Sequence, residues 1–428
     1  MMDAPSVPSG TSRVRQEDFI MCQSAQSQRP IHSHSKNAAN SAPSPRNHVE
    51  SGSRRDFLRM LMGTTLAGAS VLELGYHRAA WARAAAGLKG AGNLFGLEQA
   101  APGVFFAQAF PQAQVNCNAA IFVRSRDVVV VDAHSKPSAA ASLIQQIARE
   151  ITSKPVRYVI NTHFHWDHTQ GDHAYRAAFS PIDFVASSAT KNLMADLSVQ
   201  RVKESLDEIP ARVEELRRRA ENTGDRAEKA FCDDQIAQLE AYKSELSNYT
   251  LELPTITFDR SHLLPDPEFD LHLEFHGHAH TAGDVFVFCP RHRVLATGDT
   301  SHGWLPNIAD GFPRSWPKTI DEVAKADFKF VLGGHGPMRP DRIVMTGQRN
   351  YIEELTEKVL AAKQAGQPLQ EIQKHLTVAS LKSFRADGYG DILAGELAAS
   401  TPHYGPMPPL QDGVNNNIAD VFRNLDQV

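Results

Sequence analysis

Residues 159–175 read VINTHFHWDHTQGDHAY, and the six positions from His163 to His168 hold four strong metal-ligand side chains. In an extended backbone alternate side chains share a face, so His163 and His165 can bind one ion together. Asp167 and His168 follow after the chain turns and can point to a second ion. One catalytic zinc takes about three protein ligands and keeps an open position. Four ligands this close predict two metal ions that share a bridging water.

Further ligands are expected where other predicted strands begin or end. Three glycine-containing loops each offer one: His280 in HGHAHTAGD (276–284), Asp299 in VLATGDTSHG (294–303) and His335 in VLGGHGP (331–337). Glycine lets the backbone approach an ion closely. Together with the first loop they supply three ligands for each metal and one bridging carboxylate. His278 is the open alternative to His280, and the HTAGD context favours His280.

The surrounding sequence predicts a layered α/β protein. Strand-like segments are GVFFAQA (103–109), CNAAIFVRSRDVVVVDA (117–133), PVRYVIN (155–161) and IDFVAS (182–187), and residues 137–151 have helical spacing. Strands that alternate with helices are typical of layered α/β architecture. Further strands are predicted at 255–258, 271–275, 285–289, 293–297 and 328–334, and helices are predicted near 340–364 and at 413–426.

Residues 188–250 interrupt this rhythm. They are dense in charge, with apolar residues three and four apart, which predicts a solvated helical hairpin inserted into the domain. Its acidic and basic residues balance, so it does not indicate a nucleic-acid site. We expect it to lie beside the metal edge without supplying ligands, and we expect no single charge in it to contribute more than ~1 kcal/mol.

The N-terminal part differs in composition. Residues 1–52 are rich in Ser, Pro, Asn, Gln and His and are predicted to be disordered. Residues 53–84 resemble a twin-arginine export signal: Arg54 and Arg55 precede a moderately apolar stretch, and small-residue sites follow at Ala82 and Ala84. The expected location is therefore the periplasm, with the twin-arginine export machinery as a partner.

Composition excludes several classes of function. Hydrophobic residues make up 42% of the 428-residue chain and charged residues 22%, as in a soluble globular protein. A formal net charge of -5 provides no polybasic surface, so no nucleic-acid partner is expected. The four cysteines form neither a disulfide framework nor the paired spacing of a zinc knuckle.

The four loops carry a family resemblance. THFHWDHTQG, AHTAGD, ATGD and GGHGP occur in the order found in the metallo-β-lactamase-fold hydrolases, over roughly residues 100–345. The resemblance implies an αββα four-layer sandwich with the metals at one edge, and it leaves 346–428 as a C-terminal helical extension. It also implies two metal sites: His163, His165 and His280 at one, Asp167, His168 and His335 at the other, and Asp299 bridging them.

The same resemblance implies a reaction. Two zinc ions, with iron or manganese as alternatives, would lower the pKa of a bridging water to about 7. The resulting hydroxide would attack the carbonyl of a small-molecule ester, thioester, lactone or amide, with Asp167 orienting the nucleophile or accepting its proton. Asp132, at the end of VVVVD, is expected to fix a histidine tautomer. β-Lactam hydrolysis, iron-dependent redox or sulfur-oxygenating chemistry, and a non-catalytic metal-binding role remain open alternatives.

Overall fold

The computed structural model describes residues 94–404 and 409–426. The predicted disordered leader and the twin-arginine segment both lie outside these residues. Across the described ranges, no helix combines the length and the apolar character needed to cross a membrane. The cysteines in these ranges, Cys117, Cys232 and Cys289, are buried free thiols.

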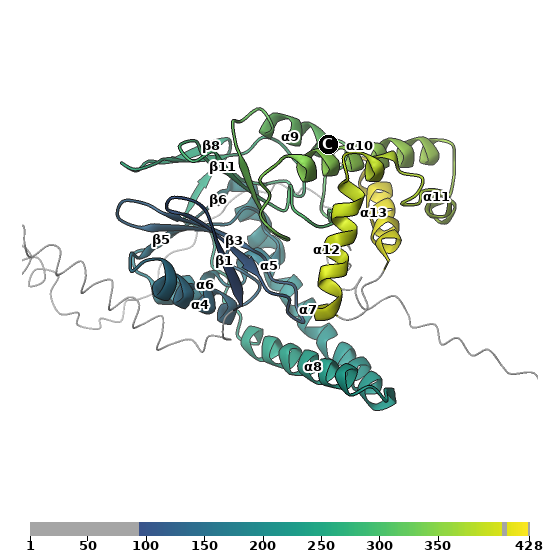
Figure 1. The fold of residues 1–428 in the computed structure, drawn as a ribbon, viewed down its shortest axis with the longest axis horizontal. Helices are drawn as coiled ribbons and strands as arrows, with labels where there is room; N and C mark the ends of the chain where they lie inside the picture. The colour runs from purple at the N-terminus through teal and green to yellow at the C-terminus, as the bar shows by residue number, and fades with distance from the viewer. Residues whose placement is uncertain (1–93, 405–408, 427–428) are drawn as a thin grey trace, which may run out of the picture.

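Two mixed β-sheets form the centre of the molecule (Figure 1). The first contains β1 (Phe95–Ala101), β2 (Val104–Ala109), β3 (Ala119–Val123), β4 (Val128–Val131), β5 (Val156–Ile160), β6 (Asp183–Ser187) and β7 (Ile256–Phe258), paired in chain order. The second has the order β12 (Phe330–Gly333), β11 (Val294–Gly298), β10 (Phe286–Cys289), β9 (Leu271–Glu274) and β8 (Ser261–Leu264). Strands β4 to β7 are parallel to one another, as are β11 and β12, and the other paired strands are antiparallel.

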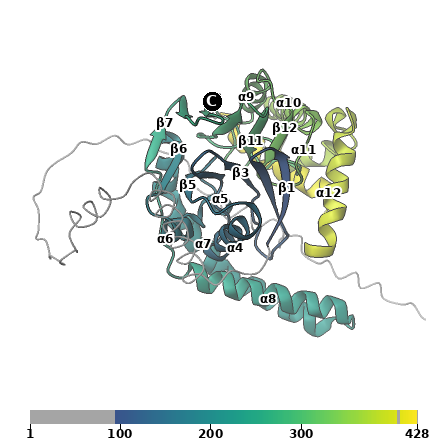
Figure 2. The same cartoon turned by 60° about the vertical axis from the view of Figure 1, so that its left-hand side comes forward.

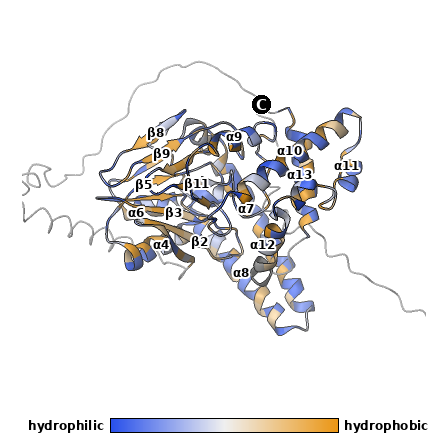
Figure 3. Cartoon of the chain, turned by 45° about the horizontal axis from the view of Figure 1, so that its top comes forward, coloured by the Kyte–Doolittle hydropathy of each residue, from blue (hydrophilic) through white to orange (hydrophobic). Residues whose placement is uncertain are grey.

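The side chains of the first sheet alternate between two cores. In β4, Val128 and Val130 pack toward the outer helices, whereas Val129 and Val131 pack toward the second sheet. This period of two is what an extended strand dictates when both faces are covered. The core between the sheets also contains Leu271 and Val287 of the second sheet. Figure 3 shows the hydrophobic colouring concentrated in these layers.

Helices cover both outer faces, and the predicted αββα four-layer sandwich is confirmed (Figure 2). The helical elements are α4 (Pro137–Gln146), a π-helical turn η1 (Ile147–Ile151), α5 (Trp166–Thr169), α6 (Asp172–Ala178), α7 (Ser188–Asn222), α8 (Arg226–Leu246), α9 (Trp316–Val323), α10 (Ile343–Gln364), α11 (Leu369–His375), a 3-10 turn η2 (Lys382–Arg385), α12 (Tyr389–Tyr404) and α13 (Leu410–Asn424). α4 and α6 pack on the first sheet, and α9, α10 and α13 share a core with the second.

Three details differ from the sequence-based predictions. Residues 117–133 form a hairpin of two antiparallel strands, β3 and β4, because Arg124 and Asp127 close a turn through a backbone hydrogen bond of 2.9 Å and an ion pair of 2.8 Å. The first sheet contains a strand, β1, that precedes the first predicted strand at 103–109. Short β8 has three of its four residues partly or fully exposed, so it lacked the apolar run that identified the other strands.

Candidate metal centre

The seven candidate ligands lie at one edge of the sandwich, where the parallel strands end. Strand β5 leads into the loop of His163 and His165, and the short helix α5 then carries Asp167 and His168. Strands β11 and β12 lead directly into Asp299 and the His335 loop, and His280 precedes β10. The parallel pairing β4–β5 and β11–β12 brings these strand ends to the same edge.

Three histidines form the first group. The facing nitrogens of His163, His165 and His280 all lie within 4.8 Å of one another, and His280 Nε2 is 2.9 Å from His165 Nδ1. The other nitrogen of each ring has its own oxygen partner. His163 Nδ1 lies 3.0 Å from Thr162 Oγ1, and His165 Nε2 lies 2.9 Å from Asp310 Oδ2. His280 Nδ1 lies 3.0 Å from the carbonyl oxygen of Asn307.

A second group contains the other predicted ligands. Asp167, His168 and His335 also have ligand atoms within 4.8 Å of one another. His335 Nε2 is 3.1 Å from Asp167 Oδ2, and His168 Nε2 is 3.5 Å from the same oxygen. The first group thus contains His163 and His165 of the HxHxDH motif, and the second contains Asp167 and His168. A third set, His163, His168 and Asp299, joins the two groups, and His168 also lies near Cys117 and Asp132.

Asp299 lies between the two groups. Its Oδ2 is 3.7 Å from His280 Nε2 in the first group and 3.3 Å from His335 Nε2 in the second. Its Oδ1 is 3.3 Å from His168 Nε2. Oδ2 thus faces both groups and Oδ1 faces the second, an arrangement in which the carboxylate could bridge two ions.

Asp132 lies beneath the ligand loop in the sense that it bonds both His168 and the backbone at Thr162. It accepts a hydrogen bond from His168 Nδ1 at 2.9 Å and from the backbone N–H of Thr162 at 2.8 Å. Its own backbone has φ 68°, a left-handed conformation that aspartate adopts more readily than bulky residues do. The partner predicted to orient a histidine is thus confirmed, and it directs His168 Nε2 toward the second group.

The protonation states suit metal binding at the first group. Burial, followed by the neighbouring imidazoles, lowers the pKa of His163 well below its ordinary value. Burial and His165 lower the pKa of His280 to about 3. Burial disfavours the ionised form of Asp299, but His335 and His168 outweigh it and hold the pKa of Asp299 well below its usual range. Neutral imidazoles and ionised carboxylates are the forms that bind divalent ions.

The second group carries protons that a cation would displace. Burial disfavours the charged form of His335, but Asp299 and Asp167 outweigh it and raise the pKa of His335 to about 9. The pKa of His168 is also raised: burial opposes the shift, and the surrounding Cys117, Asp299 and Asp167 outweigh it. Metal binding to these histidines would therefore release protons.

The residues fit divalent metal ions by an independent criterion. His163 Nε2, His168 Nε2 and Asp299 Oδ1 are buried atoms without a hydrogen-bond partner in the described part of the chain. His168 Nε2 and Asp299 Oδ1 face each other at 3.3 Å, and within the same part of the chain no hydrogen bond or ion pair is made by His163 Nε2. An unsatisfied buried polar atom costs about 1–3 kcal/mol, which a bound cation would offset. Gly334 leaves the necessary space, because a Cβ there would lie 2.1 Å from Asp299 Oδ1 and 2.8 Å from His168 Cε1.

Several neighbouring residues serve packing instead. Trp166 packs among the apolar residues of the α7–α8 hairpin, with its ring centroid 6.2 Å from that of Tyr242. The ring of His278 lies against Phe312, with the centroids 4.5 Å apart, and belongs to neither ligand group. Trp304 stacks on His335 at 4.8 Å and 13°, and its backbone N–H donates to His302 Nδ1 at 3.2 Å.

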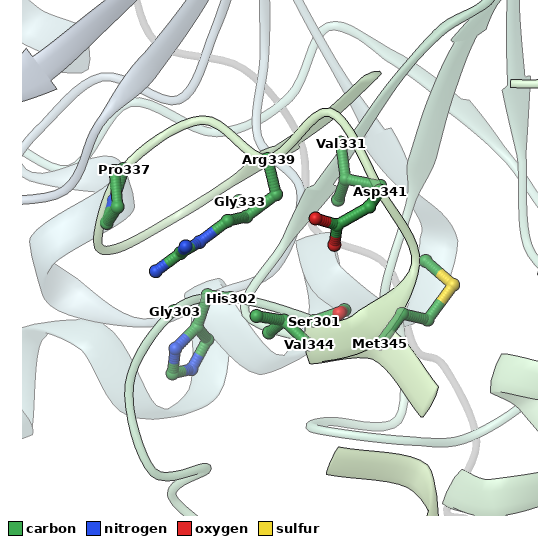
Figure 4. A pocket seen from close by; sticks show the side chains of 10 residues that line it. All are labelled: Ser301, His302, Gly303, Val331, Gly333, Pro337, Arg339, Asp341, Val344 and Met345. Atoms are coloured by element: carbon green, nitrogen blue, oxygen red, sulfur yellow. The ribbon is translucent and has the colours of Figure 1, made fainter. Parts of the chain in front are cut away.

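A narrow cavity lies behind the His335 loop (Figure 4). Its lining includes Ser301, His302, Pro337, Arg339 and Met345, and none of the seven candidate ligands. The Arg339 side chain extends across it toward Pro337 and Gly303 (Figure 4). Arg339 also pairs with Glu396 of α12 at 2.7 Å, so its side chain links the segment that follows the His335 loop to the C-terminal helices.

Sequence reasoning missed Arg201 and Asp310. Arg201 lies in α7, within the segment expected to be a solvated arm, yet its side chain is only 14% exposed and pairs with Asp310 at 2.8 Å. Asp310 in turn contacts His165. Arg201 therefore makes a largely buried ion pair, unlike the solvated charges expected of the arm, and the limit of ~1 kcal/mol for a single charge stays a prediction. No local spacing could have revealed it, since 109 positions separate the two partners.

Comparisons with known proteins concern the family and the fold. The family model of the metallo-beta-lactamase superfamily matches residues 113–335. Similar solved structures include a metallo-beta-lactamase from Pontibacter korlensis, with 18% identity, 60% of this chain and 99% of that chain covered, and a TM-score of 0.45. Another is DIM-1 metallo-beta-lactamase, with 14% identity, 60% and 97% covered, and a TM-score of 0.44.

A third similar structure covers more of the chain. The stereoselective inverting sec-alkylsulfatase Pisa1 from Pseudomonas sp. has 15% identity and a TM-score of 0.54, and the match covers 78% of this chain and 51% of that one. This chain thus spans about half of that protein, and at such identity the likeness shows the fold alone. Because the family match at 113–335 takes in more than half of its residues, this chain belongs to the metallo-beta-lactamase superfamily.

Proposed function

We propose that this protein is a binuclear zinc-dependent hydrolase acting on a carbonyl substrate such as an ester, thioester, lactone or amide. The observation that carries the proposal is the division of seven buried ligands into two groups with Asp299 facing both. Two divalent ions bound there would polarise a carbonyl oxygen and lower the pKa of a bound water to about 7. A buried site strengthens such electrostatic effects.

The protein's own residues have separable tasks. Asp167 directs Oδ2 toward His335 and His168, which leaves its other oxygen to orient the attacking water or to accept its proton. The hydrogen bond to Asp132 keeps His168 Nε2 directed at the centre. Stacking of Trp304 on His335 holds that imidazole and restricts the room beside it.

We further propose that the protein acts in the periplasm after export of the folded chain by the twin-arginine machinery. Support comes from the Arg54–Arg55 pair, the apolar stretch and the small-residue sites. The ligands lie on loops that are far apart in the sequence, so the site is complete only once the chain has folded.

The test is metal analysis and hydrolysis profiling of the mature protein. Elemental analysis is expected to find two zinc ions per chain, and a panel of chromogenic esters, thioesters, lactones and β-lactams is expected to reveal turnover on a carbonyl substrate. Asp299→Ala should lose a zinc ion and turnover together. A single iron per chain, or two zinc ions without hydrolysis of any panel member, would refute the proposal, and turnover confined to β-lactams would narrow it.

A further inference from the structure

The loop 305–311 contacts two of the three histidines of the first group. Its residue Asp310 lies 2.9 Å from His165 Nε2, and the carbonyl of Asn307 lies 3.0 Å from His280 Nδ1. The loop follows the Asp299 turn and leads toward α9, and it contains none of the seven candidate ligands. Both of these contacts are made to ring nitrogens of the histidines.

These contacts determine which nitrogen of each ring faces the centre. A carbonyl oxygen can only accept a hydrogen bond, so His280 Nδ1 must carry the proton and Nε2 presents its lone pair. A carboxylate likewise requires the proton on His165 Nε2, which leaves the lone pair on Nδ1. The two lone pairs then face each other at 2.9 Å, an arrangement that a shared cation stabilises.

Helix α7 of the insert holds Asp310 in place. Arg201 donates two hydrogen bonds to it, from Nη1 to Oδ2 at 2.8 Å and from Nη2 to Oδ1 at 2.9 Å. The guanidinium also lies over the ring of Phe164, 4.8 Å from its centroid. Phe164 stands between His163 and His165 in the sequence, so Arg201 touches the ligand loop directly and through Asp310.

Helix α13 holds the same loop from the C-terminal side. The amide of Asn424 donates to the carbonyls of Ile308 at 3.1 Å and Ala309 at 2.9 Å, and the amide of Asn417 donates to the Pro306 carbonyl at 2.9 Å. Both asparagines are buried. α13 lies beyond the region that matches the family model.

We propose that Arg201, Asp310 and the loop 305–311 form a positioning device for the three-histidine metal site, through which the helical insert and the C-terminal extension set its metal affinity. Asp310 orients His165 and fixes its tautomer, and Arg201 acts through Asp310. A fixed tautomer removes the reorganisation that a free imidazole undergoes on binding a metal. This inference rests on the proposed metal site but not on the identity of the substrate.

Metal binding tests the proposal without reference to turnover. Zinc-free full-length protein is titrated with zinc against a chromogenic chelator, and cobalt replaces zinc to record the visible spectrum of the site. Asp310→Asn retains the shape of the side chain but removes its charge, and it is expected to weaken one zinc by the 10–100-fold typical of residues that support ligands. Arg201→Met is expected to act in the same direction, and both variants should alter the cobalt spectrum.

The double variant separates positioning from a general loss of packing. If Arg201 acts through Asp310, then Arg201→Met should have little further effect on zinc affinity in the Asp310→Asn background. Arg219→Met is the matched control, because Arg219 also lies in α7 but pairs with Glu228 of the neighbouring helix at 2.7 Å. It should leave zinc affinity and the cobalt spectrum unchanged.

Arg201→Lys covers the case in which Arg201→Met fails to fold, since lysine keeps the charge but cannot make the two-pronged contact. Asn424→Ala tests the C-terminal side and is expected to weaken the same zinc. Wild-type zinc affinity and cobalt spectra in both Asp310→Asn and Arg201→Lys would overturn the proposal. Additive effects of Arg201→Met and Asp310→Asn would also refute it. Two zinc ions bound normally in a protein without hydrolase activity would count against the proposed function only.

Discussion

Gly334→Ala should disable the metal centre by adding one methyl group. Gly334 follows β12, and a Cβ there would stand 2.1 Å from Asp299 Oδ1 and 2.8 Å from His168 Cε1. Ordinary contact begins at 3.4 Å, so the carboxylate oxygen would have to move by about 1.3 Å. Metal sites hold their ligand distances within about 0.2 Å, so this displacement is incompatible with the wild-type ligand geometry.

The backbone cannot easily absorb this strain. The Gly334 N–H donates to the Gly298 carbonyl at 2.8 Å, and the Gly334 carbonyl accepts from the Asn118 N–H at 2.8 Å. Gly334 is not among the glycines with positive φ, so alanine introduces a steric conflict without backbone strain. The Asp299 side chain is therefore the part that moves.

Zinc content and zinc affinity measure the consequence. Gly334→Ala should lower the zinc content below that of the wild type and weaken binding by more than the 10–100-fold typical of supporting residues, because the displaced group is itself a candidate ligand. Gly224→Ala, between α7 and α8, is the matched control, since a Cβ there meets nothing within 4 Å. Wild-type zinc content and affinity in Gly334→Ala would refute the assignment of Asp299 to both groups.

Other changes should have equally specific results. Asp132→Asn should weaken zinc binding about 10–100-fold by releasing His168, and unchanged affinity in chelator competition would contradict this. His278→Ala should retain the zinc content of the wild type, because its ring lies against Phe312; zinc loss would favour His278 over His280 as the ligand. Burial lowers the pKa of His134 from its ordinary value of 6.5 to about 3. Between these two values the unfolded chain binds a proton that the folded chain does not, so the free energy of unfolding falls as the pH falls through this window. In this window His134→Asn should reduce the slope of the free energy of unfolding against pH by the equivalent of about one bound proton. Free energies from denaturant titrations at several pH values measure that slope, and an unchanged slope would argue against the neutral buried ring. Arg54→Lys with Arg55→Lys should keep the protein in the cytoplasm, whereas unchanged recovery of the double variant from the periplasm would argue against the export signal.

Residues whose roles depend on local spacing could be predicted from the sequence. HFHWDH places two side chains on an extended stretch and two on the following helical turn, and the structure separates them into two groups at that turn. The layered α/β architecture followed from apolar runs such as VVVV in β4, because a strand covered on both faces needs apolar side chains throughout. The αββα order of the layers was implied by the family resemblance. The hairpin at 117–133 was missed although the polar residues 124–127 interrupt the apolar run at the turn.

Only the tertiary structure could identify the supports of the metal centre. Arg201 belongs to a charged helix in which most of its neighbours are solvated, and nothing in the local sequence distinguishes it from Arg217 or Arg219. Its role depends on meeting Asp310, and Asp310 lies beside His165 only after the loop 305–311 has packed against α13. Metal ligands must have particular side-chain chemistry, so they leave a motif in the sequence. Supporting residues need only a suitable donor or acceptor at the right place in space, and that place is determined by packing between distant segments.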